Sequence, residues 1–172
     1  KILTEALKEF PSFNSSLNST NDAIIVKKYI NVGIAIDTLH GLMVPVIKNC
    51  ESKSLKQIST ELSITSEKAH NNNLVFDDIE GGTITISSLG GIGGTNFTPI
   101  VLPPQVAILG FSKMENQIVP VADGKFKKRL ILPFSLTYDH RVIDGAEAAI
   151  FTKKMKELLS SVKLIGKKNV KK

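Results

Sequence analysis

The chain passes from a β-rich apolar run into a helical pattern through eleven residues, Ser135-Leu136-Thr137-Tyr138-Asp139-His140-Arg141-Val142-Ile143-Asp144-Gly145. His140 lies where the predicted strand ends, and Asp144 follows it by four residues. A rigid scaffold holds such a turn in place, and functional residues concentrate on turns of this kind. Of the three histidines, His40, His70 and His140, only the last has so organised a setting.

The region before this stretch is rich in predicted strands. They cover residues 24–37, as one hairpin or two short strands, 42–47, 83–88, 106–112, 117–122 and about 128–138. Asp123-Gly124 is a strong hairpin signal between the last two. Pro45 lies inside the second predicted strand, which favours an edge or a bulge there. The polar stretch 15–22 is expected to be a surface turn.

Three helices are predicted. The first covers residues 2–10, and the second covers about 55–70, where Ser54 and Gln57 have capping-box spacing. The third begins near Asp144 and carries one apolar stripe, made by Ala148, Phe151, Met155, Leu158 and Val162. Three helices and about six strands, mixed rather than alternating, favour a two-layer α+β sandwich over a doubly wound fold.

Composition limits the class of protein. The chain has 172 residues, of which 42% are hydrophobic and 22% charged, as expected of one folded domain. It has no run of 18 apolar residues and no signal-peptide pattern, so we expect neither a membrane span nor export. The chain begins inside a helical pattern, so we expect it to be an N-terminally truncated fragment.

Charge and cysteine content add two expectations. The net charge is +6, and part of it lies in the lysine-rich tail 163–172, which is either solvated or a patch for an anionic partner. The tail has no aromatic residue for base stacking, so no nucleic-acid binding is expected. The single cysteine, Cys50, excludes an internal disulfide and favours a reducing compartment. No histidine lies near Cys50 in sequence, so we expect an inert thiol at a strand end.

The pair His140 and Asp144 has two interpretations. In one, Asp144 only caps a helix, with Glu147 three residues later, and His140 is an ordinary turn residue. In the other, His140 is a general base, because a neutral imidazole with a pKa near 6.5 accepts a proton from a thiol with a pKa near 8.5. Asp144 would then fix the turn that holds the ring. The two roles of Asp144 are compatible.

A second group of candidates lies around the segment 85–95, Thr-Ile-Ser-Ser-Leu-Gly-Gly-Ile-Gly-Gly-Thr. It is not a P-loop, because the Gly-Lys-Ser/Thr ending is absent. It is not a dinucleotide-binding fingerprint either, because its glycines lack the required spacing. The hydroxyl of Ser87 would lie on the face opposite Ile84 and Ile86 and would be able to stabilise an oxyanion. A flexible loop after a strand is the alternative. Asp37 ends a predicted strand before a turn, where acidic residues are usually just turn formers.

Together these segments resemble the catalytic domain of the dihydrolipoamide acyltransferases, the core subunits of the 2-oxo acid dehydrogenase complexes. The resemblance covers nearly the whole chain and is carried by five segments, which are 6–17, 32–37, 41–46, 85–99 and 138–145. It implies an α/β (α+β) two-layer sandwich similar to chloramphenicol acetyltransferase, with a mixed sheet and helices packed on one face. It also implies domain bounds of 1–165 for the catalytic domain and 166–172 for a flexible, lysine-rich tail.

The resemblance also implies roles for individual residues. His140 matches the catalytic base, Asp144 the carboxylate of the motif and Ser87 the oxyanion donor, with Ser88 as the alternative if the register differs by one. Phe97 resembles an aromatic residue that gates the lipoyl side of the active-site channel. Asp37 would lie near that channel, and so would Leu42, which belongs to the segment 41–46. No metal site is implied.

The implied activity is direct transfer of an acyl group between a dihydrolipoyl arm and coenzyme A. The loop 85–99 looks like the pyruvate branch of the family, which implies acetyl, with succinyl or branched-chain acyl groups as the alternative. The lipoate would be covalently bound on a domain absent from this chain, and coenzyme A would be a substrate. A catalytically incomplete scaffold fragment and a free-standing antibiotic acetyltransferase are the competing interpretations.

The resemblance further implies an assembly. A homotrimer with active sites between subunits would associate into a larger cubic core. Pyruvate dehydrogenase and dihydrolipoamide dehydrogenase subunits would bind through domains absent here, and neither nucleic acid nor a membrane would be a partner. A bacterial-type cytoplasmic location is expected, and a mitochondrial matrix location is compatible with the same observations.

Overall fold

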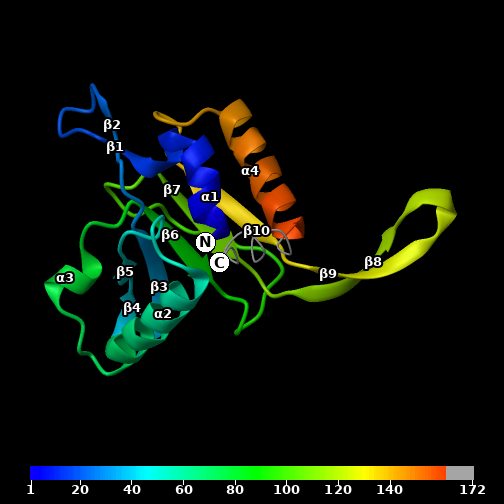
Figure 1. The fold of residues 1–172 in the computed structure, drawn as a ribbon, viewed down its shortest axis with the longest axis horizontal. Coiled ribbons are helices and arrows are strands. Elements are labelled where there is room, and N and C mark those ends of the chain that lie inside the picture. Colours follow the sequence, from blue (N-terminus) through cyan, green and yellow to red (C-terminus); the bar gives the residue numbers. More distant parts are fainter. Residues whose placement is uncertain (162–172) are drawn as a thin grey trace, which may run out of the picture.

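Residues 1–161 are described by the structure, which is a computed structural model. Within them the α-helices are α1 (Ile2–Glu9), α2 (Leu55–His70), α3 (Phe76–Ile79) and α4 (Gly145–Ser160). The strands are β1 (Ser15–Leu17), β2 (Ile24–Val26), β3 (Val32–Thr38), β4 (Gly41–Met43), β5 (Val46–Ile47), β6 (Ile84–Ser88), β7 (Ala107–Phe111), β8 (Glu115–Pro120), β9 (Phe126–Ile131) and β10 (Phe134–Tyr138). Figure 1 shows a central sheet with helices against it and a long β-ribbon that projects away.

The main sheet has the order β10-β7-β6-β3-β4, with β5 also paired to β3. Its centre is parallel, since β3, β6 and β7 run in one direction, whereas β10, β4 and β5 are antiparallel to their neighbours. Buried parallel strands are nearly continuously apolar, and four of the five residues of β7 (Ala-Ile-Leu-Gly-Phe) are buried. The predicted mixed sheet is confirmed.

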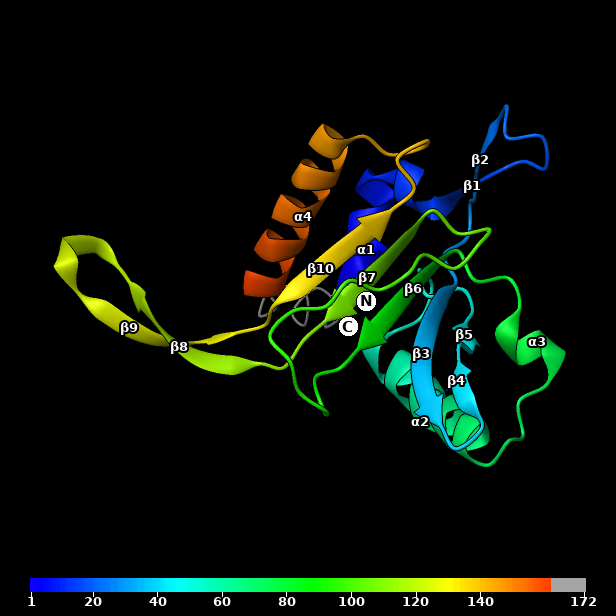
Figure 2. The ribbon, with the colours of Figure 1, turned by 180° about the vertical axis from the view of Figure 1, so that it is seen from behind.

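One face of this sheet carries the hydrophobic core. Ile84 and Leu109 point to it, together with Leu7 of α1 and Phe151 of α4. The rings of Phe13 and Phe151 stack there with centroids 4.0 Å apart. Figure 2 looks onto the opposite face, where the strands lie in front of α1 and α2. The helices therefore cover one face, as predicted, and we call the other the open face.

Around Ser87 the open face carries small and polar residues, whereas Thr85 and Ile108 on the same face are buried. Successive side chains of a strand alternate between faces, so the residues next to the core residues along each strand point to the opposite face. Paired residues of neighbouring strands share a face, and the row Ala35, Ser87, Gly110 and Ser135 crosses the sheet on this side. A sheet face made of such residues lets another surface approach closely.

The helices agree well with the sequence patterns. α2 begins at the predicted capping box, with Ser54 accepting from the Gln57 amide and Gln57 accepting in return. α4 begins after Asp144, whose carboxylate caps it. The predicted count of three helices is wrong, because α3 was missed. Val162 and the predicted tail 166–172 lie outside the described residues.

Two strand predictions and one turn prediction are wrong in ways that proline and pairing explain. The expected single strand 128–138 is two strands, β9 and β10, separated at Leu132-Pro133, where proline removes a donor. Residues 42–47 are likewise divided into β4 and β5, with Pro45 between them at the sheet edge. The expected turn 15–22 contains β1, which pairs with β2. The region 24–37 holds two strands, β2 and β3, as one of its two predicted alternatives had it, and they do not pair with each other.

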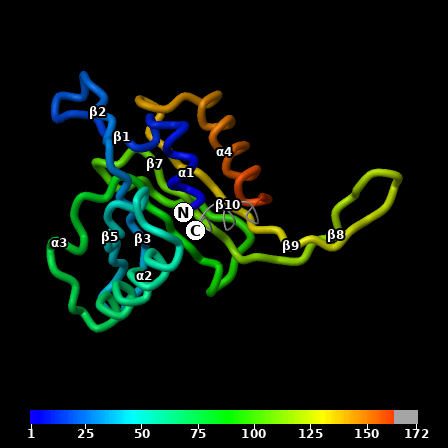
Figure 3. The backbone as a smooth tube through the Cα atoms, in the orientation of Figure 1, coloured from blue at the N-terminus to red at the C-terminus, as the bar shows by residue number. Residues whose placement is uncertain are grey.

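β8 and β9 form a two-stranded ribbon outside the main sheet (Figure 3). The Asp123-Gly124 turn predicted from sequence joins them, and both residues have positive φ, 63° and 66°. Neither strand pairs with another described strand. An isolated ribbon of this kind is marginally stable at best in water, so its exposed surface needs a partner.

Candidate active site

His140 lies on a tight turn between β10 and α4. The Asp139 amide donates to the Val106 carbonyl at 2.8 Å, which extends the pairing of β10 with β7 by one residue. The Asp139 carbonyl then accepts from the amides of Val142 and Ile143, at 3.0 and 3.1 Å. These bonds close the turn around His140, whose side chain is exposed.

Two neighbours fix the surroundings of the imidazole. The ring centroids of Tyr138 and His140 lie 5.6 Å apart, with the planes tilted by 39°. On the other side of the turn, the carboxylate of Asp144 accepts from the Glu147 amide at 2.8 Å and caps α4. The predicted capping role of Asp144 is thus confirmed, and the turn that carries His140 is anchored at both ends.

Ser87 lies far from this turn, on β6. It is half-buried and its hydroxyl points to the open face, in the row with Ala35 and Gly110. The ring of Phe97 lies over Gly110 in the same row, since a Cβ at Gly110 would be 2.8 Å from Phe97 Cζ. The hydroxyl of Ser135 donates to the Phe97 carbonyl at 2.6 Å and holds this loop residue in place. Ser87 and Phe97 therefore both lie next to Gly110 on the open face.

Asp37 and Leu42 lie near the same end of the open face. They are paired across β3 and β4, and both are exposed, Leu42 at 67%. Asp37 is two residues beyond Ala35, so it shares a face with Ser87. Ser88 is exposed at the end of β6 and alternates onto the core side, where its hydroxyl accepts from the Gly90 amide at 3.4 Å. Strand geometry thus favours Ser87 over Ser88 as a donor on the open face.

The two halves of the predicted site do not meet within one chain. Ser87 is level with Ser135 through Gly110, and His140 is five residues beyond Ser135. At about 3.3 Å per residue this is roughly 16 Å along the strand, with two inter-strand spacings in addition. A general base must lie within hydrogen-bond reach of the proton that it takes. His140 and Ser87 of one chain are too far apart to share a substrate carbonyl and thiol.

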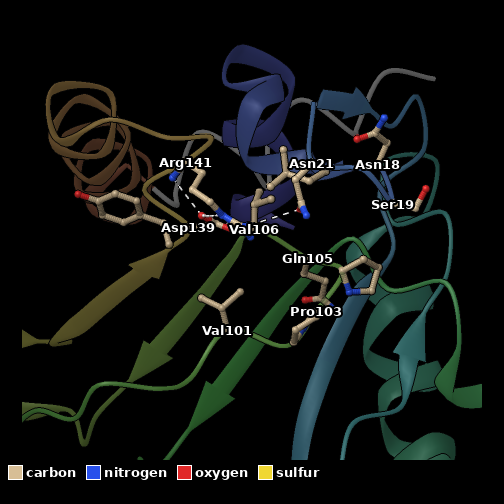
Figure 4. A pocket seen from close by; sticks show the side chains of 12 residues that line it. Asn18, Ser19, Asn21, Val101, Pro103, Gln105, Val106, Asp139 and Arg141 are labelled. Carbon is tan, nitrogen blue, oxygen red and sulfur yellow. Dashed lines mark hydrogen bonds and ion pairs between the residues drawn. The ribbon is translucent and has the colours of Figure 1, made fainter. Parts of the chain in front are cut away.

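A cavity of about 610 Å³ lies beside the His140 turn. Figure 4 shows it between the β1–β2 turn, with Asn18, Ser19 and Asn21, and the end of β10, with Asp139 and Arg141. The Arg141 guanidinium contacts the Asp139 carboxylate at 2.6 Å and lowers the pKa of that carboxyl. The pair therefore stays charged throughout the neutral pH range.

Sequence patterns missed three contributors to these two regions. Tyr138 packs against the imidazole, Asn21 contacts Arg141 from a distant turn, and Gly110 makes room for Phe97. For Gly110 a signal was available, because a glycine inside an apolar strand often marks a close approach. The contacts of Asn21 join residues 120 positions apart, which periodicity does not reveal.

We expect Gly110→Ala to destabilise the fold by about 1–3 kcal/mol through overpacking. The added Cβ would lie 2.7 Å from Ser135 Oγ and 2.8 Å from Phe97 Cζ, so the Phe97 loop must move. Gly91→Ala is the matched control, since nothing lies within 4 Å of its Cβ position. Denaturant unfolding measures both. Equal stability of the two variants would show that Phe97 does not rest on Gly110.

Metal binding, membrane insertion and cysteine chemistry are three further functions to consider for residues 1–161. Residues 1–161 contain no group of three or more His, Cys, Asp or Glu side chains that is arranged to hold a metal ion. In the same part of the chain, no helix combines the length and apolarity needed to cross a bilayer. Cys50 is buried, and burial raises the pKa of its thiol, which agrees with an inert side chain.

Comparison with known proteins identifies relatives along almost the whole chain. Residues 1–166 match the family described as 2-oxoacid dehydrogenases acyltransferase (catalytic domain). The chain is 53% identical, over 96% of its length, to the dihydrolipoyllysine-residue acetyltransferase component of the pyruvate dehydrogenase complex of Pseudomonas aeruginosa, and 55% identical over 96% to that of Azotobacter vinelandii. It spans 30% and 26% of the lengths of these two relatives.

Solved structures give the same result. The A. vinelandii dihydrolipoamide acetyltransferase, studied for the catalytic role of a serine, a histidine and an asparagine, superposes with a TM-score of 0.91 at 53% identity, covering 96% of this chain and 68% of that one. A cubic core of the pyruvate dehydrogenase multienzyme complex gives 0.88 at 51%, covering 96% and 70%. Chloramphenicol acetyltransferase, at 18% identity and a TM-score of 0.61 over 92% and 74%, shares the fold.

Proposed function

The chain belongs to the 2-oxoacid dehydrogenase acyltransferases, as their catalytic domain, and we propose that it transfers an acetyl group directly between a dihydrolipoyl thioester and coenzyme A. The observation that carries the proposal is the exposed imidazole of His140, held on a turn closed by Asp139 and capped by Asp144. An exposed imidazole on an anchored turn is suited to take a proton from a thiol.

In the proposed mechanism, His140 accepts the proton of the coenzyme A thiol. The resulting thiolate attacks the carbonyl carbon of the acetyl-dihydrolipoyl thioester, and the hydroxyl of Ser87 donates to the oxyanion that forms. The intermediate collapses with cleavage of the bond between carbon and the lipoyl sulfur, and His140 returns its proton to that sulfur. No acyl-enzyme forms, and the proton balance of the cycle is zero.

Asp144 has a positional role in this mechanism. The A. vinelandii relative carries its histidine and asparagine four residues apart, the same interval as between His140 and Asp144. Asparagine and aspartate both cap a helix through a side-chain oxygen. We therefore assign to Asp144 the task of holding the turn rather than that of supplying a negative charge.

The complete site requires two copies of the chain. His140 and Ser87 lie at opposite ends of one sheet, so in the proposed assembly His140 of one copy faces Ser87, Phe97 and Asp37 of the next. The open face, with its small residues, supports such an approach. This is the arrangement expected of a homotrimer, and the likeness to a cubic core supports further association of trimers.

The β8–β9 ribbon is the second surface that we assign to this contact. Pairing places Ile118, Phe126 and Leu130 on one face of the ribbon, where they are 75, 70 and 62% exposed. Asn116, Pro120 and Lys128 share this face. Gln117 and Arg129 lie on the other face. Exposed apolar patches of this kind mark interaction sites, and a second copy of the chain is the partner that also completes the site.

A charge on the apolar face of the ribbon should therefore break the assembly. We expect Ile118→Asp combined with Phe126→Asp to convert the oligomer into monomer, because burial of two carboxylates costs several kcal/mol. Gln117→Asp, on the opposite face, is the control and should retain the oligomer. Light scattering gives the mass. An unchanged mass for the double variant would place the ribbon outside the interface.

An acceptor and donor screen tests the activity itself. We expect transfer from acetyl-coenzyme A to dihydrolipoamide, with slower rates from succinyl- and branched-chain acyl-coenzyme A. A preference for either of these donors would move the chain to another branch of the family. Acetylation of chloramphenicol but not of dihydrolipoamide would indicate an antibiotic acetyltransferase. An assembled oligomer without any rate would indicate a scaffold.

Membership of the same family also suggests a lipoyl-domain substrate, partner subunits and a location. The lipoyl group would reach the site as a substrate, carried on a separate lipoyl domain. We propose that pyruvate dehydrogenase and dihydrolipoamide dehydrogenase subunits are the partners of the complete complex, and that the cytoplasm is its location. The likeness to acetyltransferase components of pyruvate dehydrogenase complexes supports these partners.

A further inference from the structure

Arg141 and Asp139 form a clamp around His140. The guanidinium donates to both carboxylate oxygens of Asp139, through Nη2 at 2.6 Å and through Nε at 3.0 and 3.2 Å. The Arg141 amide also donates to Asp139 Oδ1, at 3.0 Å. The side chains before and after His140 are thus joined to each other, in the fork geometry that only arginine offers to a carboxylate.

The clamp is fixed to a second part of the molecule. Arg141 Nη1 donates to Asn21 Oδ1 at 3.4 Å, from the β1–β2 turn (Figure 4). That turn is closed by its own bonds, because the Asn21 amide donates to the Asn18 carbonyl and Asn18 Oδ1 accepts from the amides of Asp22 and Ala23. Asn21 therefore gives the clamp an anchor that is independent of β10 and α4.

The ion pair does little for stability. The Arg141 side chain is 64% exposed, and exposed ion pairs contribute about 0–1 kcal/mol. A role in holding the turn explains the ion pair better than a contribution to stability. The ring of His140 makes no side-chain hydrogen bond to another residue of the range 1–161, and Tyr138 is its aromatic neighbour. The direction of the imidazole thus depends on the backbone turn that the clamp holds.

We propose that Arg141 and Asp139 are positioning residues for His140, and that Asn21 anchors them to the β1–β2 turn. The inference rests on the proposed role of His140 as the base. A small misplacement of a catalytic group costs up to about a hundredfold in rate. The clamp thus acts on turnover and leaves substrate affinity unchanged.

Arg141→Lys tests the clamp directly, because lysine keeps the charge and loses the fork. We expect kcat to fall by about tenfold, with KM for coenzyme A within about twofold of the original value. Mass and melting temperature should not change. Addition of guanidinium ion to Arg141→Ala should restore part of kcat. Full activity of the lysine variant, or a loss confined to KM, would overturn the proposal.

The anchor is tested by Asn21→Gly, which removes the acceptor without backbone strain, because Asn21 has a φ of 59°. Asn72→Gly is the matched control, since Asn72 is exposed with a φ of 54° at the end of α2. We expect kcat to fall severalfold for the first variant only. Equal kcat for both variants would remove Asn21 from the clamp.

Hydrogen exchange separates the clamp from the proposed function. The amides of Arg141, Val142 and Ile143 all donate to Asp139, so they should exchange faster in Arg141→Lys than in the unaltered chain. If the unaltered chain transfers no acetyl group and these amides still respond, the proposed function fails and the clamp stands. Unchanged exchange together with unchanged kcat would refute the clamp alone.

Discussion

His140→Ala should lower the rate of acetyl transfer by at least about a hundredfold, since general base catalysis contributes about 10²–10⁴-fold. In the proposed mechanism alanine leaves the coenzyme A thiol without a proton acceptor, and a thiol with a pKa near 8.5 is mostly protonated at pH 7. The departing lipoyl sulfur also loses its proton donor. The measurement is transfer from acetyl-coenzyme A to dihydrolipoamide.

The structure indicates that this substitution is tolerated by the fold. The imidazole is exposed, and the bonds that close its turn involve the backbone of Asp139 and the side chain of Asp144. Mass and melting temperature should therefore match those of the unaltered chain. His70→Ala, at the exposed end of α2, is the control. A His140→Ala variant that retains its rate would exclude this residue as the base.

Ser87→Ala should lower the rate by about 10²–10³-fold, the usual cost of one oxyanion donor. In the proposed mechanism the hydroxyl acts on the charge that develops in the transition state, so affinity for coenzyme A should change little. Its position on β6, held by pairing on both sides, gives the donor a fixed direction. The readouts are kcat and KM for each substrate.

Ser88→Ala is the matched control for this prediction. It differs from Ser87 by one residue, but its side chain alternates away from the open face and accepts from the Gly90 amide. We expect a rate close to that of the unaltered chain. The reverse result, a loss for Ser88→Ala alone, would shift the donor by one position. A Ser87 defect confined to KM would contradict the oxyanion role.

Local signals predicted most elements of this fold. The capping box at Ser54, the Asp144 cap and the Asp123-Gly124 turn each depend on residues close in sequence, and all three are present. The predictions that failed concern which strands pair with each other. β9 and β10 are separated by only two residues, Leu132 and Pro133, and pairing, with β8 for one and β7 for the other, assigns them to different sheets.

The candidate site shows the same limit. Alternation along β6 correctly predicted that Ser87 faces away from Ile84 and Ile86, and helix-start chemistry correctly identified the role of Asp144. The distance between Ser87 and His140 depends on strand order, which no local pattern contains. The link between Asn21 and Arg141 likewise arises from the way in which the β1–β2 turn folds back on the sheet.

The distance between Ser87 and His140 within one sheet also bears on control of the reaction. If the base and the oxyanion donor meet only across two copies, a chain that has just left the ribosome holds both groups and is still inert toward acetyl-coenzyme A. Activity then rises with the concentration of assembled chains rather than of synthesised ones. Dilution or loss of one neighbour would act as an off switch without any change in the residues themselves.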